Sequence, residues 1–306
     1  MKLPPIRNFT ADFKSEAWRA AADIICRTHK IPFQRLRRAE HGESIVFLVD
    51  ERFVVKIYNP RRDGLAREKT ALEIARTSLK IPQIVAAGEI ENYQYLVTTQ
   101  LAGASLTREN WLQLDESEQI PVLAQLAAGL RELHSTDSSQ IDFDWQKFID
   151  LQAATCFERQ KACRVNARVL AEIPAYLEEN LKLLPQNVAP VFLHGDVHFG
   201  NLRLLKTNGK WEISGLFDFA DSLKGFHEYE FLAVCVLMIQ GQGSLQREFF
   251  RAFGYAENEI SDELRTRLML LTMFYECSDL RRYAVRLRPE AVDYSLLELE
   301  RAIWNF

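Results

Sequence analysis

The sequence lacks three features, each of which would point to a class of protein. No apolar run approaches the roughly 20 residues that a membrane span needs, so we expect no membrane segment. The first residues, 1–7, contain no apolar core of the kind that a secretion signal carries. The formal net charge is −4, from 38 Lys and Arg against 42 Asp and Glu, so no broad basic field favours nucleic acid as a partner.

Cysteine is also scarce. The five cysteines are odd in number, scattered, and form no C-x-x-C pair, which argues against a disulfide framework. We predict free, mostly buried thiols of the kind that a reducing cytoplasm maintains. The remaining composition, 47% hydrophobic and 26% charged, is that of an ordinary globular protein, and 306 residues allow one large domain or two lobes.

Side chains that can do chemistry concentrate in one stretch. The apolar residues 191–193 predict a short buried strand, and the loop after it carries His194, Asp196, His198 and Asn201 within eight positions. Loops held between rigid elements are where binding and catalytic groups are usually placed. This density of polar groups therefore indicates a functional site rather than a solvated loop.

A second strand is predicted to bring another carboxylate to this loop. Asn208-Gly209 between two strand-like runs is a hairpin signal, so the two strands should be antiparallel and Asp218 should return close to Asn201. An Asp and an Asn together offer hard oxygen ligands, which suit Mg²⁺ bound to substrate phosphates. Asp196 is then free to accept a proton from a hydroxyl group, which is the division of labour in phosphoryl transfer.

These residues resemble a known family. The segment His194-Gly-Asp-Val-His-Phe-Gly-Asn201, with Leu216-Phe-Asp218 beyond it, resembles the aminoglycoside phosphotransferases, relatives of protein kinases that include choline- and homoserine-kinase-like members. The resemblance implies that Asp196 is the catalytic base and that Asn201 and Asp218 bind magnesium. It also implies ATP or GTP as phosphoryl donor. The acceptor would be a hydroxyl of a small molecule, such as an aminoglycoside or another antibiotic in a resistance reaction.

The first hundred residues read as a small sheet. Strand-like runs are predicted over 34–40, 44–49 and 53–58, joined by hairpin turns. In a kinase-like lobe the first turn, His41-Gly-Glu-Ser44, would lie over the nucleotide phosphates and Ser44 would contact them. This turn contains a single glycine, so a plain hairpin is the alternative.

Lys56 and Glu68 form the second signal in this part. Lys56 lies inside the third strand-like run, and Glu68 lies near the start of a helix predicted over 65–78. Each has an ordinary explanation, a solvent-facing lysine and a first-turn acid favoured by the helix dipole. Together, upstream of the polar loop, they indicate the kinase ion pair, in which a Glu orients a Lys that contacts the α and β phosphates.

Helical patterning replaces strand patterning after Ala102-Gly103. This shift predicts an α+β, bilobal fold, with a small antiparallel-sheet N-lobe over 1–101 and a larger, mainly helical C-lobe over 102–306, and the resemblance implies that the fold is protein-kinase-like. The resemblance implies that Thr99 to Leu101 is the hinge whose backbone binds the nucleobase edge. The strands before the hinge are predicted over 81–90 and 93–101, and the later helices over 116–134, 145–163, 167–184, 227–240, 244–253, 262–284 and 289–304.

The chain departs from the family pattern after Asp218. The family usually has a Gly-Asp pair and then a further Asp, whereas here Gly225 is followed by Phe226, and Glu230 stands where the last acid would be. We expect these positions to be structural and activity to be retained.

Other functions stay open. His194-x-Asp-x-His198 contains ligand types that suit zinc in a metallohydrolase, but this leaves Lys56 and Glu68 unexplained. A non-catalytic nucleotide-binding pseudokinase is a second alternative. A protein kinase is disfavoured because the sequence has no H-R-D loop and no A-P-E segment. Among small-molecule kinases, a choline, amino-acid or sugar kinase is the alternative to an antibiotic kinase, and the oligomeric state is not indicated.

Acidic residues suggest the charge of the acceptor. The resemblance to kinase-like enzymes implies that two segments, 226–240 and 262–284, flank a pocket below Asp196. Two acids three positions apart on the second segment would share a helix face. An anionic pocket would favour a cationic acceptor, such as an amino sugar or a choline-like amine. The alternative is that these acids are solvated or paired with neighbouring arginines. The acids are Glu228, Glu230, Glu276 and Asp279.

Overall fold

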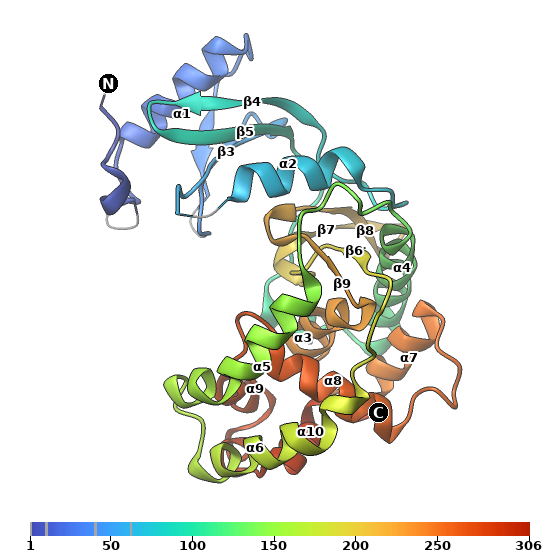
Figure 1. The fold of residues 1–306 in the computed structure, drawn as a ribbon. Coiled ribbons are helices and arrows are strands. Elements are labelled where there is room, and N and C mark those ends of the chain that lie inside the picture. Colours follow the sequence, from blue (N-terminus) through green and yellow to red (C-terminus); the bar gives the residue numbers. More distant parts are fainter. Residues whose placement is uncertain (1, 10–11, 40–41, 62) are drawn as a thin grey trace.

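The chain folds into a sheet-containing N-terminal part and a larger, mainly helical C-terminal part (Figure 1). The computed structural model describes residues 2–9, 12–39, 42–61 and 63–306. The end of the first predicted strand and the start of the predicted phosphate turn, Glu40 and His41, lie outside the described residues. The α+β fold with a small antiparallel sheet and a helical C-terminal part is confirmed.

The N-terminal sheet has five antiparallel strands in the order β1-β2-β3-β5-β4. Alternate side chains point to opposite faces, and one face is buried against helix α1 (Ala17–Thr28). The ring of Trp18 on α1 packs 4.9 Å from that of Tyr93 on the sheet. The strands are β1 (Leu36–Arg38), β2 (Ile45–Val49), β3 (Phe53–Ile57), β4 (Ile84–Ile90) and β5 (Tyr93–Thr99).

Helix α2 (Gly64–Ile74) links the two parts. Its apolar residues belong to the same core as the C-terminal helices, and Figure 1 shows it between the sheet and the C-terminal part. The helix ends four residues earlier than predicted. The backbone turns extended at Ala75, and the N–H of Arg76 then bonds Oγ1 of Thr136 instead of continuing the helix.

Two short antiparallel pairs carry the polar loop. Strand β6 (Val191–Leu193) pairs with β9 (Leu223–Gly225), and β7 (Leu202–Thr207) pairs with β8 (Lys210–Leu216). The predicted hairpin at Asn208-Gly209 is confirmed, with positive φ at both turn residues. The N–H of Phe217 donates to the carbonyl of Asn201 at 3.0 Å, so the end of β8 does return to the polar loop as predicted.

The C-terminal helices match the prediction best where their apolar pattern is long. Helix α4 begins and ends at the predicted residues, whereas the five-residue α3, capped by Thr107, is too short to show a period and was not predicted. None of the helices in the described residues is long and apolar enough to cross a membrane. The helices are α3 (Arg108–Leu112), α4 (Glu116–His134), α5 (Trp145–Ala162), α6 (Ala167–Asn180), α7 (Gly243–Phe253), α8 (Asp262–Phe274), α9 (Leu280–Leu287) and α10 (Leu296–Ile303).

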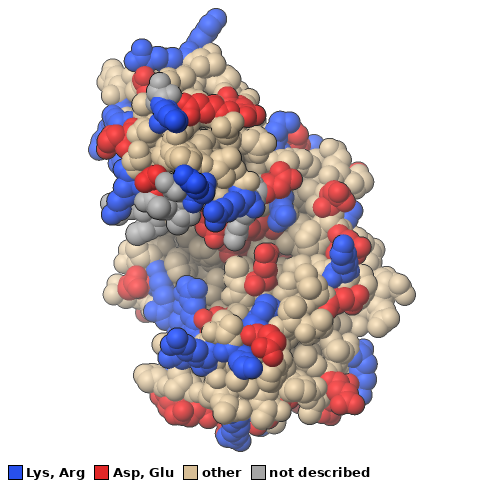
Figure 2. Space-filling model, turned by 60° about the vertical axis from the view of Figure 1, so that its left-hand side comes forward, with Lys and Arg blue, Asp and Glu red and all other residues tan. Residues whose placement is uncertain are grey.

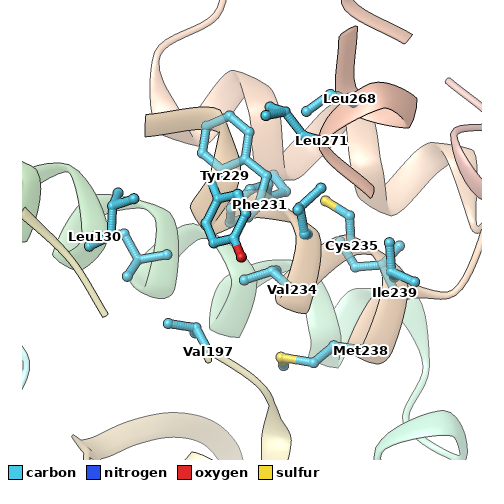
Figure 3. Packing of buried hydrophobic residues seen from close by; sticks show 14 of the residues in the cluster. Leu130, Val197, Tyr229, Phe231, Val234, Cys235, Met238, Ile239, Leu268 and Leu271 are labelled. Carbon is cyan, nitrogen blue, oxygen red and sulfur yellow. The ribbon is translucent and has the colours of Figure 1, made fainter. Parts of the chain in front are cut away.

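Besides α2, three predicted helices differ most from the structure. The segment 227–240 forms a 3₁₀ turn (His227–Glu230) and a π-helix (Ala233–Ile239), because its glutamates turn inward and its apolar residues are buried on all sides (Figure 3). The segment 262–284 is broken into α8 and α9 by a turn after Phe274. The segment 289–304 is a 3₁₀ turn followed by α10, whose start is set by a capping box at Ser295.

A tight approach between two backbone segments at the start of the C-terminal part tests this packing. Gly103 has φ of +95°, and a Cβ there would lie 2.5 Å from the carbonyl oxygen of Leu204, which already accepts the N–H of Ala104. Gly209 also has a positive φ, but a Cβ there meets nothing within 4 Å. Both alanine variants bear the left-handed backbone cost, and only Gly103→Ala adds a clash with backbone.

We expect Gly103→Ala to lower the free energy of unfolding by about 2 kcal/mol more than Gly209→Ala. Chemical denaturation of the two variants and the wild type measures this difference. Equal losses in the two variants would show that the chain near Gly103 relaxes freely.

Candidate active site

Lys56 joins the two parts of the molecule. Its Nζ on β3 lies 2.6 Å from Oε2 of Glu68 on α2 and 2.7 Å from Oδ1 of Asp218 after β8. The hydroxyl of Tyr58 donates to the same Glu68 oxygen at 2.6 Å. Glu68 is buried, so this shared oxygen fixes the lysine from the N-terminal side.

The charges of this ion pair stabilise one another. Burial alone would lower the pKa of Lys56, but the carboxylates of Glu68 and Asp218 outweigh it and raise the pKa above its usual value. Burial would raise the pKa of Asp218, and the Lys56 ammonium outweighs that effect, so the carboxyl pKa is lowered. Both groups are therefore ionised at neutral pH.

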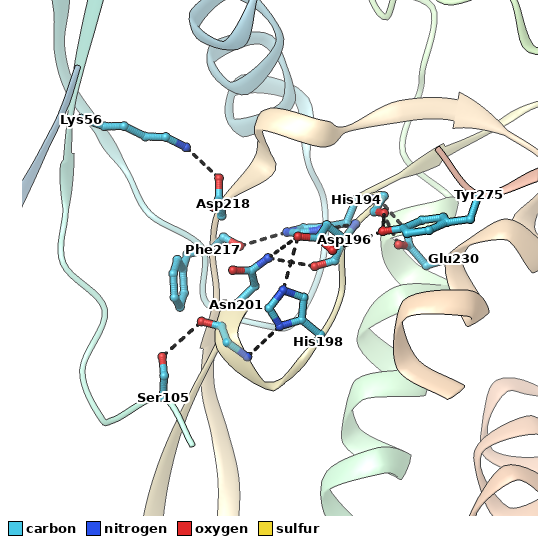
Figure 4. A network of polar contacts seen from close by, with 12 residues as sticks. Lys56, Ser105, His194, Asp196, His198, Asn201, Phe217, Asp218, Glu230 and Tyr275 are labelled. Atoms are coloured by element: carbon cyan, nitrogen blue, oxygen red, sulfur yellow. Dashed lines mark hydrogen bonds and ion pairs between the residues drawn. The ribbon is translucent and has the colours of Figure 1, made fainter. Parts of the chain in front are cut away.

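Asp196 is held by partners from its own polar loop and from the turn after α8 (Figure 4). Nδ2 of Asn201 donates to the carbonyl and to Oδ2 of Asp196 at 2.9 and 3.0 Å, and the hydroxyl of Tyr275 lies 3.2 Å from Oδ1. Nε2 of His198 lies 3.4 Å from Oδ2. Burial raises the pKa of Asp196, but the hydrogen bond and charge of His198 with the other partners lower it overall, so the carboxylate is ionised and can accept a proton.

His194 connects the polar loop to the end of β8. The ring is fully buried, its Nε2 lies 3.0 Å from the carbonyl of Phe217, and its Nδ1 accepts the N–H of Asp196. Both ring nitrogens are used by backbone groups, which does not fit a zinc ligand. Over the described residues there is no group of three or more His, Cys, Asp or Glu side chains that could hold a metal ion.

Glu230 fixes the backbone of the same loop. It is buried, and its two carboxylate oxygens accept the N–H groups of His194 at 2.6 Å and Gly195 at 2.9 Å. The departure from the family pattern at this position therefore keeps a carboxylate that bonds backbone, as expected of a structural residue. Phe226 is buried, and together with Trp145 it lines a cavity of about 180 Å³. None of the site residues lines this cavity.

Asp218 and Asn201 offer oxygen ligands for a metal ion. Asp218 has a left-handed backbone (φ 68°, ψ 64°), and its carboxylate is partly exposed beside Lys56. Because Nδ2 of Asn201 faces Asp196, the amide oxygen is turned the other way. One carboxylate and one amide oxygen form a hard donor set with few protein ligands, which fits Mg²⁺ and does not fit zinc.

Among the described residues, the remaining predicted nucleotide residues have no hydrogen bond or ion pair with this cluster. Ser44 is in the turn before β2, and Thr99 ends β5 with its N–H already donated to Gln83 at 2.9 Å. Leu101 packs on Gly215 of β8. Tyr275 is a site residue that the sequence analysis missed, because it lies in a turn that was predicted to be helix.

The predicted acidic face is wrong. Glu228 is buried and bound at two oxygens by Arg267, both at 2.7 Å, and Glu230 is used by the polar loop. Glu276 lies exposed in the turn after α8, and Asp279 caps α9 by accepting the N–H of Arg282. These two acids therefore do not share a helix face.

The thiols agree with the sequence analysis. The described cysteines form no disulfide, and Cys26, Cys156 and Cys235 are buried. Burial raises the pKa of the Cys26 and Cys156 thiols to about 11, which leaves them protonated and unreactive at neutral pH. None of them contributes to the site.

Several solved structures share this fold. The GDP complex of a wild-type aminoglycoside 2'-phosphotransferase-IIIa matches with a TM-score of 0.70 and 14% identity, over 94% of this chain and 99% of that one. The streptomycin–ATP ternary complex of APH(2'')-IIa matches with a TM-score of 0.58 and 20% identity, over 91% and 98%. A gentamicin complex of APH(2'')-IIa matches with a TM-score of 0.59 and 20% identity, over 93% and 96%.

The sequence comparisons address the family directly. No curated protein matches the chain. A family model described as "Phosphotransferase enzyme family" matches residues 35–268, which is more than half of the chain and includes both the Lys56 pair and the polar loop. The protein therefore belongs to the phosphotransferase enzyme family.

Proposed function

We propose that the protein is a Mg²⁺-dependent kinase that transfers the γ-phosphoryl group of ATP or GTP to a hydroxyl of a small molecule. The observation that carries this proposal is the Lys56–Asp218 ion pair, which brings a carboxylate and a cation to one side of Asp196 and Asn201. Phosphoryl transfer needs a cation for the phosphates, oxygen ligands for a metal ion and a base for the acceptor. Lys56 is the candidate cation, Asn201 and Asp218 are the candidate metal ligands, and Asp196 is the candidate base.

The donor side is formed by residues of both parts. Lys56, oriented by Glu68, would hold the α and β phosphates, and Ser44 would lie over them. Asn201 and Asp218 would hold Mg²⁺, which would neutralise charge on the transferred phosphoryl group. The division into lobes at 1–101 and 102–306, with Thr99 and Leu101 at the hinge, belongs to the same proposal.

Asp196 would act on the acceptor. Its carboxylate is ionised, and Asn201 and Tyr275 bond its two oxygens, so its orientation is fixed before the acceptor binds. It would orient the acceptor hydroxyl and take its proton as the oxygen bonds to phosphorus. The backbone of the polar loop is fixed beside Asp196, because Glu230 accepts the N–H of Gly195.

The acceptor class is supported by the fold neighbours. Solved structures of the same fold include complexes with streptomycin, gentamicin and kanamycin. An aminoglycoside or another antibiotic is therefore the first acceptor to test, and choline-like, amino-acid and sugar alcohols are the next. A screen of nucleotide consumption across such alcohols, with mass spectrometry of the products, tests the proposal. The buried thiols of Cys26, Cys156 and Cys235, which form no disulfide, support a cytoplasmic location.

Asp196→Asn tests the base. The substitution keeps size and hydrogen bonding but removes the proton acceptor, so we expect turnover to fall by roughly 10²- to 10⁴-fold with nucleotide binding nearly unchanged. Steady-state kinetics with calorimetric nucleotide binding measures both quantities. Near-normal turnover would remove Asp196 from the mechanism.

Asp218→Ala tests the metal ligands. The variant loses a metal oxygen and the partner of Lys56, so we expect Mg²⁺-dependent nucleotide binding to be lost while the protein stays folded. Circular dichroism checks the fold, and a titration with Mg²⁺ and Zn²⁺ identifies the metal. Activity that survives EDTA, or that needs zinc, would support the metallohydrolase alternative.

Glu276→Gln tests whether the acceptor is cationic. Glu276 is exposed and adjoins Tyr275, which contacts Asp196, so it could face an amine on the acceptor. We expect a roughly tenfold rise in KM for amine-bearing acceptors and none for neutral analogues. Asp279→Asn is the matched control, because Asn keeps the α9 cap. Equal wild-type rates for charged and neutral acceptors would show that Glu276 does not select a cationic acceptor.

A further inference from the structure

Three arginines of the C-terminal part lie together on two helices. Arg108 is on α3, and Arg282 and Arg286 are four positions apart on one face of α9. Nη2 of Arg108 donates to the carbonyl oxygen of Arg286 at 3.3 Å and to Oε1 of Gln240 at 2.6 Å. Arg286 and Gln240 line one small recess. We call these three arginines the arginine cluster.

Both helices of the cluster begin next to the polar loop. Ser105, three residues before Arg108, donates its hydroxyl to the carbonyl of Leu202 at 3.0 Å, and Figure 4 shows its side chain directed toward the polar loop. On the other side, Tyr275 precedes α9 across a short turn, and its hydroxyl lies 3.2 Å from Oδ1 of Asp196. The cluster is therefore tethered to the segment that carries the proposed base through both of its helices.

The positive charge of the cluster is not compensated. Burial lowers the pKa of Arg286, and the like charges of Arg282 and Arg108 lower it further. Asp279 acts in the opposite direction but does not outweigh them, and its carboxylate already accepts the N–H of Arg282 as the cap of α9.

The hydrogen-bond partners of the cluster are neutral. Arg108 donates to an amide oxygen and a backbone carbonyl, and its Nε is buried without a hydrogen-bond partner among the described residues. Within the same part of the chain none of the three arginines forms an ion pair, unlike the arginines of α7 and α8. Like charges held together without a counter-charge destabilise the fold, so this arrangement favours a ligand that brings negative charge.

The cluster adjoins the side from which an acceptor would reach Asp196. Tyr283 lines the same recess as Arg286. Burial raises the pKa of Tyr275, and the charges of Asp196 and Tyr283 raise it further, so Tyr283 is also close to the residue that bonds Asp196. Figure 2 shows the surface hollowed between the upper and lower parts, with Lys and Arg side chains gathered on the lower part beside the hollow. An acceptor on this side therefore meets a positive field.

We propose that the arginine cluster binds an acidic group of the acceptor, a carboxylate or a phosphate, while the hydroxyl to be phosphorylated lies at Asp196. This inference rests on the proposed function. A guanidinium offers its N–H donors as a planar fork that matches either acid in bidentate geometry. A neutral alcohol would leave the charges uncompensated and is therefore disfavoured. Glu276 lies in the turn before α9, so an acceptor that carries both an acid and an amine could use both sites.

Calorimetric binding in the presence of Mg²⁺ and ADP tests the inference. The probes are two series whose members differ in one group: glycerol, glycerate and glycerol phosphate, and glucose, glucuronate and glucose phosphate. We expect an acidic member to bind the wild type about tenfold more tightly than its neutral counterpart, and the carboxylate and phosphate arms identify which acid is bound. Arg282→Gln and Arg286→Met should each remove most of this preference and leave the neutral members unchanged.

Arg281→Gln is the matched control. Arg281 is exposed on α9 next to Arg282, but adjacent helical positions point in different directions, so we expect the preference for acids to be kept. Thermal unfolding checks each variant. Arg282 is exposed, so Arg282→Gln decides the question if Arg286→Met does not fold.

Three results would overturn the inference. The first is that no acidic member binds more tightly than its neutral counterpart, and the second is a preference for acids that Arg282→Gln leaves intact. The third is an equal loss in Arg281→Gln, which would show a diffuse field rather than a binding site. If the wild type does not bind ADP with Mg²⁺, the proposed function fails together with this inference, whereas ADP binding without a preference for acids refutes this inference alone.

Discussion

The ion pair of Lys56 with Glu68 and Asp218 is the interaction on which the site depends. Glu68 is buried, and the lysine is nearly so, so breaking their pair by removing one partner costs on the order of 3–5 kcal/mol. Asp218, by contrast, is partly exposed and approaches from the other part of the molecule. The lysine is therefore held by a buried partner in the N-terminal part and by a partly exposed partner in the C-terminal part, so that water reaches the contact with Asp218 more easily than the contact with Glu68.

The polar loop is rigid for a different reason. Its backbone is bound by buried side chains, with Glu230 accepting from His194 and Gly195, and His194 bonding the carbonyl of Phe217. A buried carboxylate with two backbone donors is satisfied and costs little, whereas losing it would leave both N–H groups unpaired. Asp196 thus keeps its position although it lies on a loop, and the same bonds hold the end of β8 from which Asp218 projects.

The sequence predicted the elements with strong local signals. Helix α4 was predicted from its apolar period, and the hairpin at Asn208-Gly209 from turn chemistry that needs positive φ. The approach of Lys56 to Glu68 was predicted because a strand lysine followed by a helix glutamate, upstream of the polar loop, matches the kinase ion pair. The elements that failed are those decided by tertiary contacts, such as the segment 227–240, whose glutamates bond Arg267 and backbone far away in the chain. No local pattern reports a partner that lies 39 residues away, as Arg267 lies from Glu228.

The turn between α8 and α9 shows how such a failure hides function. The apolar pattern continues through it, so it was predicted to be helix, yet the backbone becomes extended at Tyr275. Arg159 bonds the carbonyls of Met273 and Tyr275, and the ring of Tyr275 packs 5.5 Å from that of Tyr229. The break therefore replaces helical hydrogen bonds with side-chain ones, and in return it aims the Tyr275 hydroxyl at Asp196. A continued helix would satisfy the same carbonyls but would leave one oxygen of the carboxylate without this donor. The helix is interrupted at the point where Asp196 receives a hydrogen-bond donor from outside the polar loop.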